Sequence, residues 1–117
     1  MKAGCRLSLN MDFAEFLQEV NKIQCQEKRT QTPDYVEVVV AKTHWEVMDK
    51  VLQDYFGPPL KPQGQNPSRD ADRCAKPYGG VRRDQTLYFK KSETRSCAAL
   101  LWPWGNGTLT TLKIIRS

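Results

Sequence analysis

The amino-acid sequence predicts an α+β fold, a two-layer sandwich in which a four-stranded, mostly antiparallel sheet carries two helices on one face. Two observations lead to this prediction. The first half of the chain contains two segments with apolar residues at helical spacing, and a valine-rich segment lies between them. The last third contains three segments rich in β-branched and aromatic residues, and their short connections favour antiparallel pairing. The expected order is therefore α-β-α-long loop-β-β-β, within a single domain that spans residues 11–117.

Residues 12–28 are predicted to form the first helix. Its apolar side chains recur at helical spacing and form one stripe, which consists of Phe13, Phe16, Leu17, Val20 and Ile23. Asp12 can accept a hydrogen bond from a free amide of the first turn, and Glu15 has the spacing of its reciprocal partner in a capping box. Residues 1–10 precede this helix, lack the apolar stretch of a secretory signal and are expected to form a flexible N-terminal extension.

A strand and a second helix are predicted after a connector at residues 30–34. Residues 35–41 are almost continuously apolar and β-branched, which is typical of an inner strand with a helix on at least one side. Thr43 and Glu46 have the spacing of a capping box, so the second helix is expected to begin at Thr43. It should end before Gly57, which suits the left-handed position after a helix. The predicted apolar face consists of Trp45, Met48, Val51, Leu52, Tyr55 and Phe56.

Three strands are predicted in the last third of the chain, at residues 85–91, 97–104 and 108–116. Residues 105–107, with the sequence Gly-Asn-Gly, are a strong hairpin signal because Asn and Gly both accept positive φ angles. Pro103 lacks the amide hydrogen that a β-ladder needs, so it should lie near the end of its strand or on an unpaired edge.

A long polar loop is predicted at residues 57–84, and it holds five of the seven prolines. Connections longer than about 15 residues without regular structure are uncommon in compact domains, and they are usually functional or disordered. The loop also lies in the basic half of the chain, because residues 1–56 carry a net charge of −2 and residues 57–117 carry +7. Clustered positive charge raises the local concentration of anionic partners, so we expect the binding surface in this half.

The candidate binding residues are the cations and aromatic residues of the loop and of the adjoining strand. Arginine presents a planar fork that matches carboxylate and phosphate groups, while aromatic rings provide apolar contact. The two tryptophans near the end of the chain should share one sheet face, because they are two residues apart. The residues predicted to bind a ligand or partner are Arg69, Arg73, Lys76, Tyr78, Arg82, Arg83, Trp102 and Trp104.

These patterns favour a small cytoplasmic binding module over an enzyme, with an anionic ligand or a protein as its partner and with no cofactor. The module is expected to be a monomer or a homodimer. Nucleic acid is an alternative partner, because basic residues with interleaved tyrosines are used by single-strand binders. No apolar run approaches the roughly 18 residues that a membrane span needs, so no membrane association is expected.

The alternative class is a small enzyme whose loop closes over its substrate and uses Asp70, Asp72 or His44. The common nucleotide, zinc-protease and hydrolase motifs are absent from the sequence. The four cysteines have no CxxC or CxH spacing, so neither a zinc site nor any other metal site is expected. With no secretory signal, free thiols in a reducing compartment are the expectation.

Overall fold

The structure, a computed structural model, describes residues 12–91 and 95–116 of the chain. The extension expected at residues 1–10 lies outside these residues. The described elements, in chain order, are α2 (Phe13–Lys22), β1 (Glu27–Gln31), β2 (Tyr35–Ala41), the 3₁₀ turn η2 (Lys42–His44), α3 (Trp45–Phe56), α4 (Arg69–Ala75), the 3₁₀ turn η3 (Lys76–Tyr78), β3 (Thr86–Lys91), β4 (Ser96–Pro103) and β5 (Leu109–Arg116).

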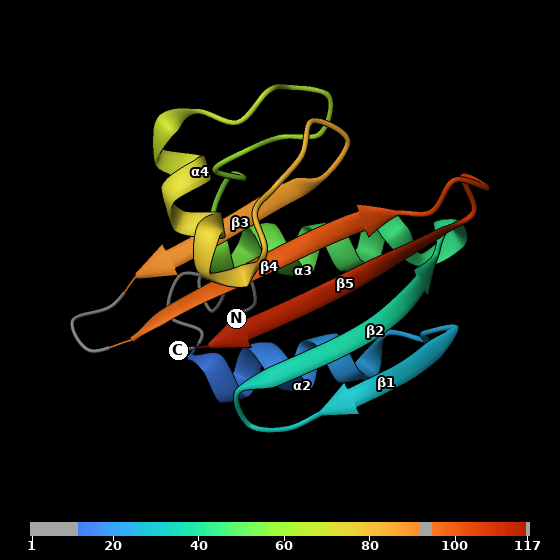
Figure 1. The fold of residues 1–117 in the computed structure, drawn as a ribbon. Helices are drawn as coiled ribbons and strands as arrows, with labels where there is room; N and C mark the ends of the chain where they lie inside the picture. Colours follow the sequence, from blue (N-terminus) through green and yellow to red (C-terminus); the bar gives the residue numbers. More distant parts are fainter. Residues whose placement is uncertain (1–11, 92–94, 117) are drawn as a thin grey trace.

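The strands form one antiparallel sheet in the order β1-β2-β5-β4-β3. Helices α2 and α3 cover one face, which we call the back face, whereas α4 lies on the opposite front face, over β3 and β4 only (Figure 1). The predicted α+β class is confirmed. The predicted details of four strands and of helices on a single face are wrong, because the sheet has a fifth strand and α4 packs on its other side.

The fifth strand is β1, which lies where the first helix was expected to continue. The helix ends at Lys22, and the Gln26 amide then donates a 2.8 Å hydrogen bond to the Val39 carbonyl of β2. Pairing with β1 removes an open edge from the apolar strand β2. β1 itself is short, polar and irregular between Lys28 and Thr30, as is common for strands at the edge of a sheet. The predicted connector at residues 30–34 therefore begins inside a strand.

The predicted helix ends differ in how well they agree with the structure. The Asp12–Glu15 capping box is present, with both reciprocal hydrogen bonds, at 2.8 and 3.2 Å. The capping box predicted for Thr43 is wrong, because α3 is preceded by η2 and begins at Trp45 without a side-chain cap. Gly57 ends α3 with a φ of 81°, the positive value expected there.

The segment 57–84 is not the irregular loop that its composition predicts, because it contains α4 and η3. The Ser68 side chain accepts a 3.1 Å hydrogen bond from the Ala71 amide and so caps α4. Ala71 and Ala75 are fully buried against the front of β3 and β4. Their small size lets the helix approach the sheet closely, so this part of the segment forms a local layer on the front face.

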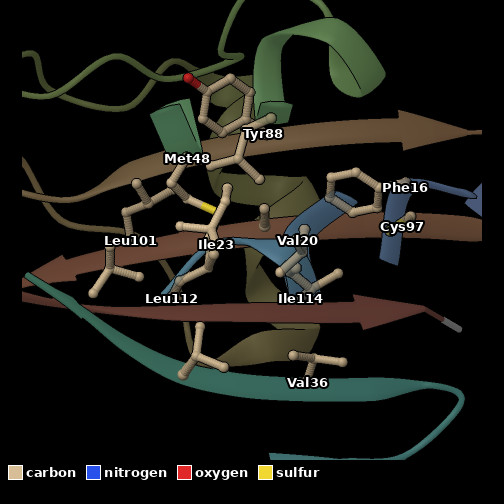
Figure 2. Packing of buried hydrophobic residues seen from close by; sticks show 14 residues of the cluster. Phe16, Val20, Ile23, Val36, Met48, Tyr88, Cys97, Leu101, Leu112 and Ile114 are labelled. Atoms are coloured by element: carbon tan, nitrogen blue, oxygen red, sulfur yellow. The ribbon is translucent and has the colours of Figure 1, made fainter. Parts of the chain in front are cut away.

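The main core lies between the back face and the helices α2 and α3 (Figure 2). Both predicted helical stripes face it, with Phe16, Val20, Met48 and Leu52 fully buried. The back face contributes the alternate positions of β2, β5 and β4, as the strand period requires. No helix within the described residues is long and apolar enough to cross a membrane.

Candidate functional site

Four of the predicted binding residues lie on α4 and η3, in front of β3 and β4. Arg69, Arg73 and Lys76 are exposed, and Arg73 forms a surface ion pair with Asp70 at 3.0 Å. Tyr78 is half-buried and packs against the small apolar cluster under α4, where Trp102 also packs. The structure thus brings the aromatic residues of the segment and of β4 into one cluster, while the cations remain on the outer surface.

Arg82 and Arg83 lie in the turn that leads into β3. Both are exposed, and they line a shallow hollow together with Gln63, Gly64 and Asp84. A hydrogen bond of 2.8 Å joins the two sides of this hollow, from the Gly64 amide to the Arg83 carbonyl. These two arginines therefore form a separate cationic site from those of α4.

Trp102 and Trp104 share the front face, as predicted, and both are half-buried. The Lys113 ammonium lies 3.7 Å from the centre of the Trp102 ring, a close cation–π contact. Trp104 donates a 2.8 Å hydrogen bond from its indole nitrogen to the Thr111 hydroxyl, and the Arg29 guanidinium lies 5.8 Å from its ring centre. Each tryptophan is therefore paired with a cation.

The Trp104 side chain crosses the front of the sheet. Its indole bonds to Thr111 on β5, and its ring contacts Arg29, which belongs to β1 on the far side of β2. Val39 lies between these strands and is fully buried, although no helix among the described residues covers this part of the front face (Figure 1). A layer of side chains covers the sheet there, in place of a helix.

Glu37 connects the charged groups of this layer. It accepts hydrogen bonds from the Tyr35 hydroxyl and from Arg29, the latter at 3.2 Å. The Tyr35 hydrogen bond, followed by the nearby charges of Arg29 and Lys113, holds the pKa of Glu37 below its ordinary value. Its carboxylate is therefore charged and compensates both cations in part.

We use the term front surface for Arg29, Tyr35, Glu37, Trp102, Trp104 and Lys113. The sequence predicted only the two tryptophans of this set as site residues. Arg29 was missed because β1 was not predicted, so nothing placed it beside the sheet. The position of Lys113 could have been predicted, because it faces the same side of the sheet as Trp102 when β4 and β5 form a hairpin.

The other cations of the basic half lie elsewhere. Lys61, expected in the loop, is 1% exposed and donates hydrogen bonds to the carbonyls of Arg83 and Gln85.

Lys90, Arg95 and Arg116 line a cavity of about 160 Å³ at the other end of the back face. Asp34 pairs there with Arg95 and Arg116, at 3.0 and 3.2 Å. The positive charge of the basic half is therefore divided and does not form one continuous surface.

The residues considered for an enzyme are not brought together. Asp70 and Asp72 lie on α4, in front of the sheet, whereas His44 precedes α3, behind it. His44 contacts the neighbouring Thr43 hydroxyl at 3.4 Å. Among the residues that the structure describes, no group of three or more His, Cys, Asp or Glu side chains could hold a metal ion.

A further concave site lies behind the sheet and was not predicted. A cavity of about 390 Å³, which we call the α3 pocket, is bounded by α3, the start of the 57–84 segment and the β4–β5 hairpin. Asp49 lines it and accepts hydrogen bonds from the Tyr88 hydroxyl at 2.5 Å and from the Gln53 amide at 3.0 Å. Asp49 and Tyr88 are far apart in the sequence, so no local pattern indicates their contact.

Several buried and half-buried groups predict a loss of stability at high pH. Burial raises the pKa of Tyr35, Tyr55 and the Cys97 thiol to about 12, and burial followed by the Asp49 hydrogen bond raises that of Tyr88. These groups keep their protons in the folded state at pH values where the unfolded chain has lost them. Their contribution is complete below pH ~9 and is lost as the pH rises toward 12. Lys61 opposes this trend, since burial lowers its pKa, but it is one group against four.

The measurement is urea unfolding at a series of pH values between neutral and strongly alkaline. We expect the free energy of unfolding to fall steadily above pH ~9. Tyr88→Phe should show a shallower decline, because it removes one of the responsible groups. A free energy of unfolding that stays constant or rises over this range would contradict the assignment.

Comparison with models of protein families, with curated proteins and with solved structures finds no match for this chain.

Proposed function

We propose that the chain is a binding module that recognises an acidic segment of a partner protein through the front surface. One observation carries the proposal: two half-buried tryptophans lie on the front face, each with a cation at its ring. Trp, Tyr and Arg are enriched at the energetic centres of protein interfaces, because they combine large apolar area with polar groups. The proposal involves no cofactor.

The charges of this side of the molecule support an acidic partner. The stretch of residues 69–84, which includes α4 and η3 in front of the sheet, carries five arginines and lysines against three aspartates. Arg29 and Lys113 are already partly compensated by Glu37. We therefore assign most of the affinity to contact with the tryptophans, and we assign orientation and association rate to the charges.

Two further expectations belong to this proposal. The protein acts as a monomer or homodimer in the cytoplasm, and the free thiols of Cys25, Cys74 and Cys97 are in keeping with a reducing compartment. Nucleic acid is the weaker candidate partner, because single-strand binders track the phosphate backbone with a continuous basic groove, and here the cations are divided.

Fluorescence anisotropy with two labelled probes of equal charge tests the proposal. The first is a short poly-glutamate peptide with interspersed leucines, and the second is a single-stranded oligodeoxythymidylate. We expect the peptide to bind more tightly, and we expect Lys113→Glu to weaken its binding about tenfold or more through like-charge repulsion. The matched control is Lys22→Glu, which makes the same charge change on α2, on the other side of the sheet.

The outcomes separate the two partner classes. Tighter binding of the oligonucleotide, with an affinity that falls steeply with salt, would favour the nucleic-acid alternative. Equal losses in Lys113→Glu and Lys22→Glu would show that net charge alone drives binding, and the front surface would then have no special role. A change in tryptophan emission on peptide binding in a Trp45→Phe background would support direct contact with Trp102 and Trp104.

A further inference from the structure

The α3 pocket has the size and lining of a small-molecule site. Its volume of about 390 Å³ lies within the range of roughly 300–1,000 Å³ that is usual for ligand pockets. Trp45, Asp49 and Gln53 line it from α3, at a spacing of four residues that places them on one helix face. Pro59 and Leu101 add apolar walls from the 57–84 segment and from β4. The pocket therefore combines apolar walls with a few polar groups.

Among the described residues, the charged side chains that line the α3 pocket are one acid, Asp49, and one base, Lys42. Asp49 lies in the second turn of α3, and Lys42 is exposed on η2, just before the helix. Within the described part of the chain, Lys42 makes no ion pair, and Asp49 receives its hydrogen bonds from neutral donors. The pocket thus presents a negative and a positive group that do not neutralise each other.

The Asp49 carboxylate is held in a fixed position. One oxygen accepts the Tyr88 hydroxyl and the other accepts the Gln53 amide, so the side chain cannot rotate without losing a hydrogen bond. Each carboxylate oxygen has a second lone pair, and the group therefore retains capacity for further donors. Because the pKa of Tyr88 is raised, its hydroxyl stays protonated and remains a donor at neutral pH.

We propose that the α3 pocket binds a small zwitterion, a free α-amino acid, whose ammonium group pairs with Asp49 and whose carboxylate pairs with Lys42. A ligand with a single charge would pair with one of the two pocket charges and leave the other without a partner. A zwitterion compensates both. Its side chain contacts Trp45 and the apolar walls. The pocket lies on the opposite side of the sheet from the front surface, so this inference does not depend on the proposed function.

Chemical-shift titration of the ¹⁵N-labelled full chain tests the proposal. The probes are the standard L-amino acids and, for each one that binds, the matching amine without the carboxylate and the matching acid without the amine. We expect saturable shifts at the amides of Trp45, Asp49 and Thr108, with a Kd of about 1 mM or below for the best amino acid, a range that suits so small a ligand. Both analogues should bind roughly tenfold more weakly or worse, since each lacks one charged contact.

Two variants assign the contacts, because each should affect only the ligands that carry the complementary group. Asp49→Asn, which can still accept the Tyr88 hydroxyl, should weaken binding of the amino acid and the amine but not of the acid. Lys42→Gln should weaken binding of the amino acid and the acid but not of the amine. The matched controls are Asp54→Asn and Lys50→Gln, a surface pair on α3 that does not line the pocket, and they should bind as the unchanged chain does.

The proposal is overturned if no amino acid gives saturable shifts at these amides while the unfolding curve shows a folded chain. It is also overturned if an analogue with one charge binds as tightly as the zwitterion. Equal losses for all three ligands in Asp49→Asn, with unchanged thermal stability, would likewise contradict a direct contact with the ammonium group.

Discussion

Phe16→Ala is expected to lower the free energy of unfolding by about 3–5 kcal/mol, the usual range for truncating a fully buried phenylalanine. Phe16 is completely buried at the centre of an aromatic cluster between α2 and α3. Its ring stacks on Tyr55, with centroids 4.3 Å apart and an interplanar angle of 9°, and it meets Phe56 edge-on at 5.4 Å. The truncation removes these contacts and leaves a cavity that two rigid rings cannot easily fill.

Urea unfolding at neutral pH, with the Phe13→Ala and Phe16→Leu variants as controls, measures this effect. Phe13 is half-buried at the edge of the same cluster, so its truncation should cost clearly less than that of Phe16. Phe16→Leu retains most of the volume but loses the ring contacts, so we expect a loss of about 1–2 kcal/mol. If Phe13→Ala proved as damaging as Phe16→Ala, the centre of the core would lie elsewhere. A domain of this size has only about 5–15 kcal/mol of stability in total.

Local patterns predicted the parts of the fold that depend on local interactions. The stripe of α2 and the apolar face of α3 follow from helical spacing alone, because a helix can bury only one side. The Asp12–Glu15 capping box and the hairpin at residues 105–107 also involve neighbours in the sequence. Each of these features is decided within a few residues of its own position.

Features that depend on distant partners were not predictable in the same way. β1 has a fully polar sequence, and it forms a strand because the backbone of β2 offers hydrogen bonds at an otherwise open edge. α4 is short, and its burial depends on Ala71 and Ala75 meeting the front of β3 and β4. The same holds for the candidate sites, since contacts such as Arg29 with Trp104 and Asp49 with Tyr88 exist only after the sheet has formed.

Lys61 is the clearest case in which the residue type misleads. In the sequence it is a cation of the predicted polar loop, which suggests an exposed side chain. In the structure its ammonium group is buried and donates two hydrogen bonds of 2.5 Å, to the carbonyls of Arg83 and Gln85. Its backbone also pairs with Leu87 in both directions, at 3.2 and 3.0 Å. Lys61 therefore connects the start of the 57–84 segment to the edge strand β3 by hydrogen bonds.

Lys61→Ala is expected to destabilise the fold by about 2–4 kcal/mol, because it removes two buried hydrogen bonds and a buried side chain. Lys61→Met separates these two causes. Met retains most of the volume, so we expect a smaller loss of stability, about 1–2 kcal/mol. This loss equals the contribution of the two hydrogen bonds minus the cost of burying an ammonium group that has no carboxylate in contact. Urea unfolding measures both variants, and Lys50→Ala, at an exposed site on α3, should change the stability by less than about 0.5 kcal/mol.

Hydrogen exchange shows which part of the fold is loosened when Lys61 is substituted. The Leu87 and Gly64 amides bond to the carbonyls of Lys61 and Arg83, so they should exchange faster in both Lys61 variants, whereas amides in the centre of β5 should change only as global stability does. If Lys61→Met were as stable as the unchanged chain or more stable, burial of the charge would outweigh its two hydrogen bonds. The 57–84 segment would then be held mainly by Ala71 and Ala75 against the sheet, and Ala71→Gly should loosen it more than any change at Lys61.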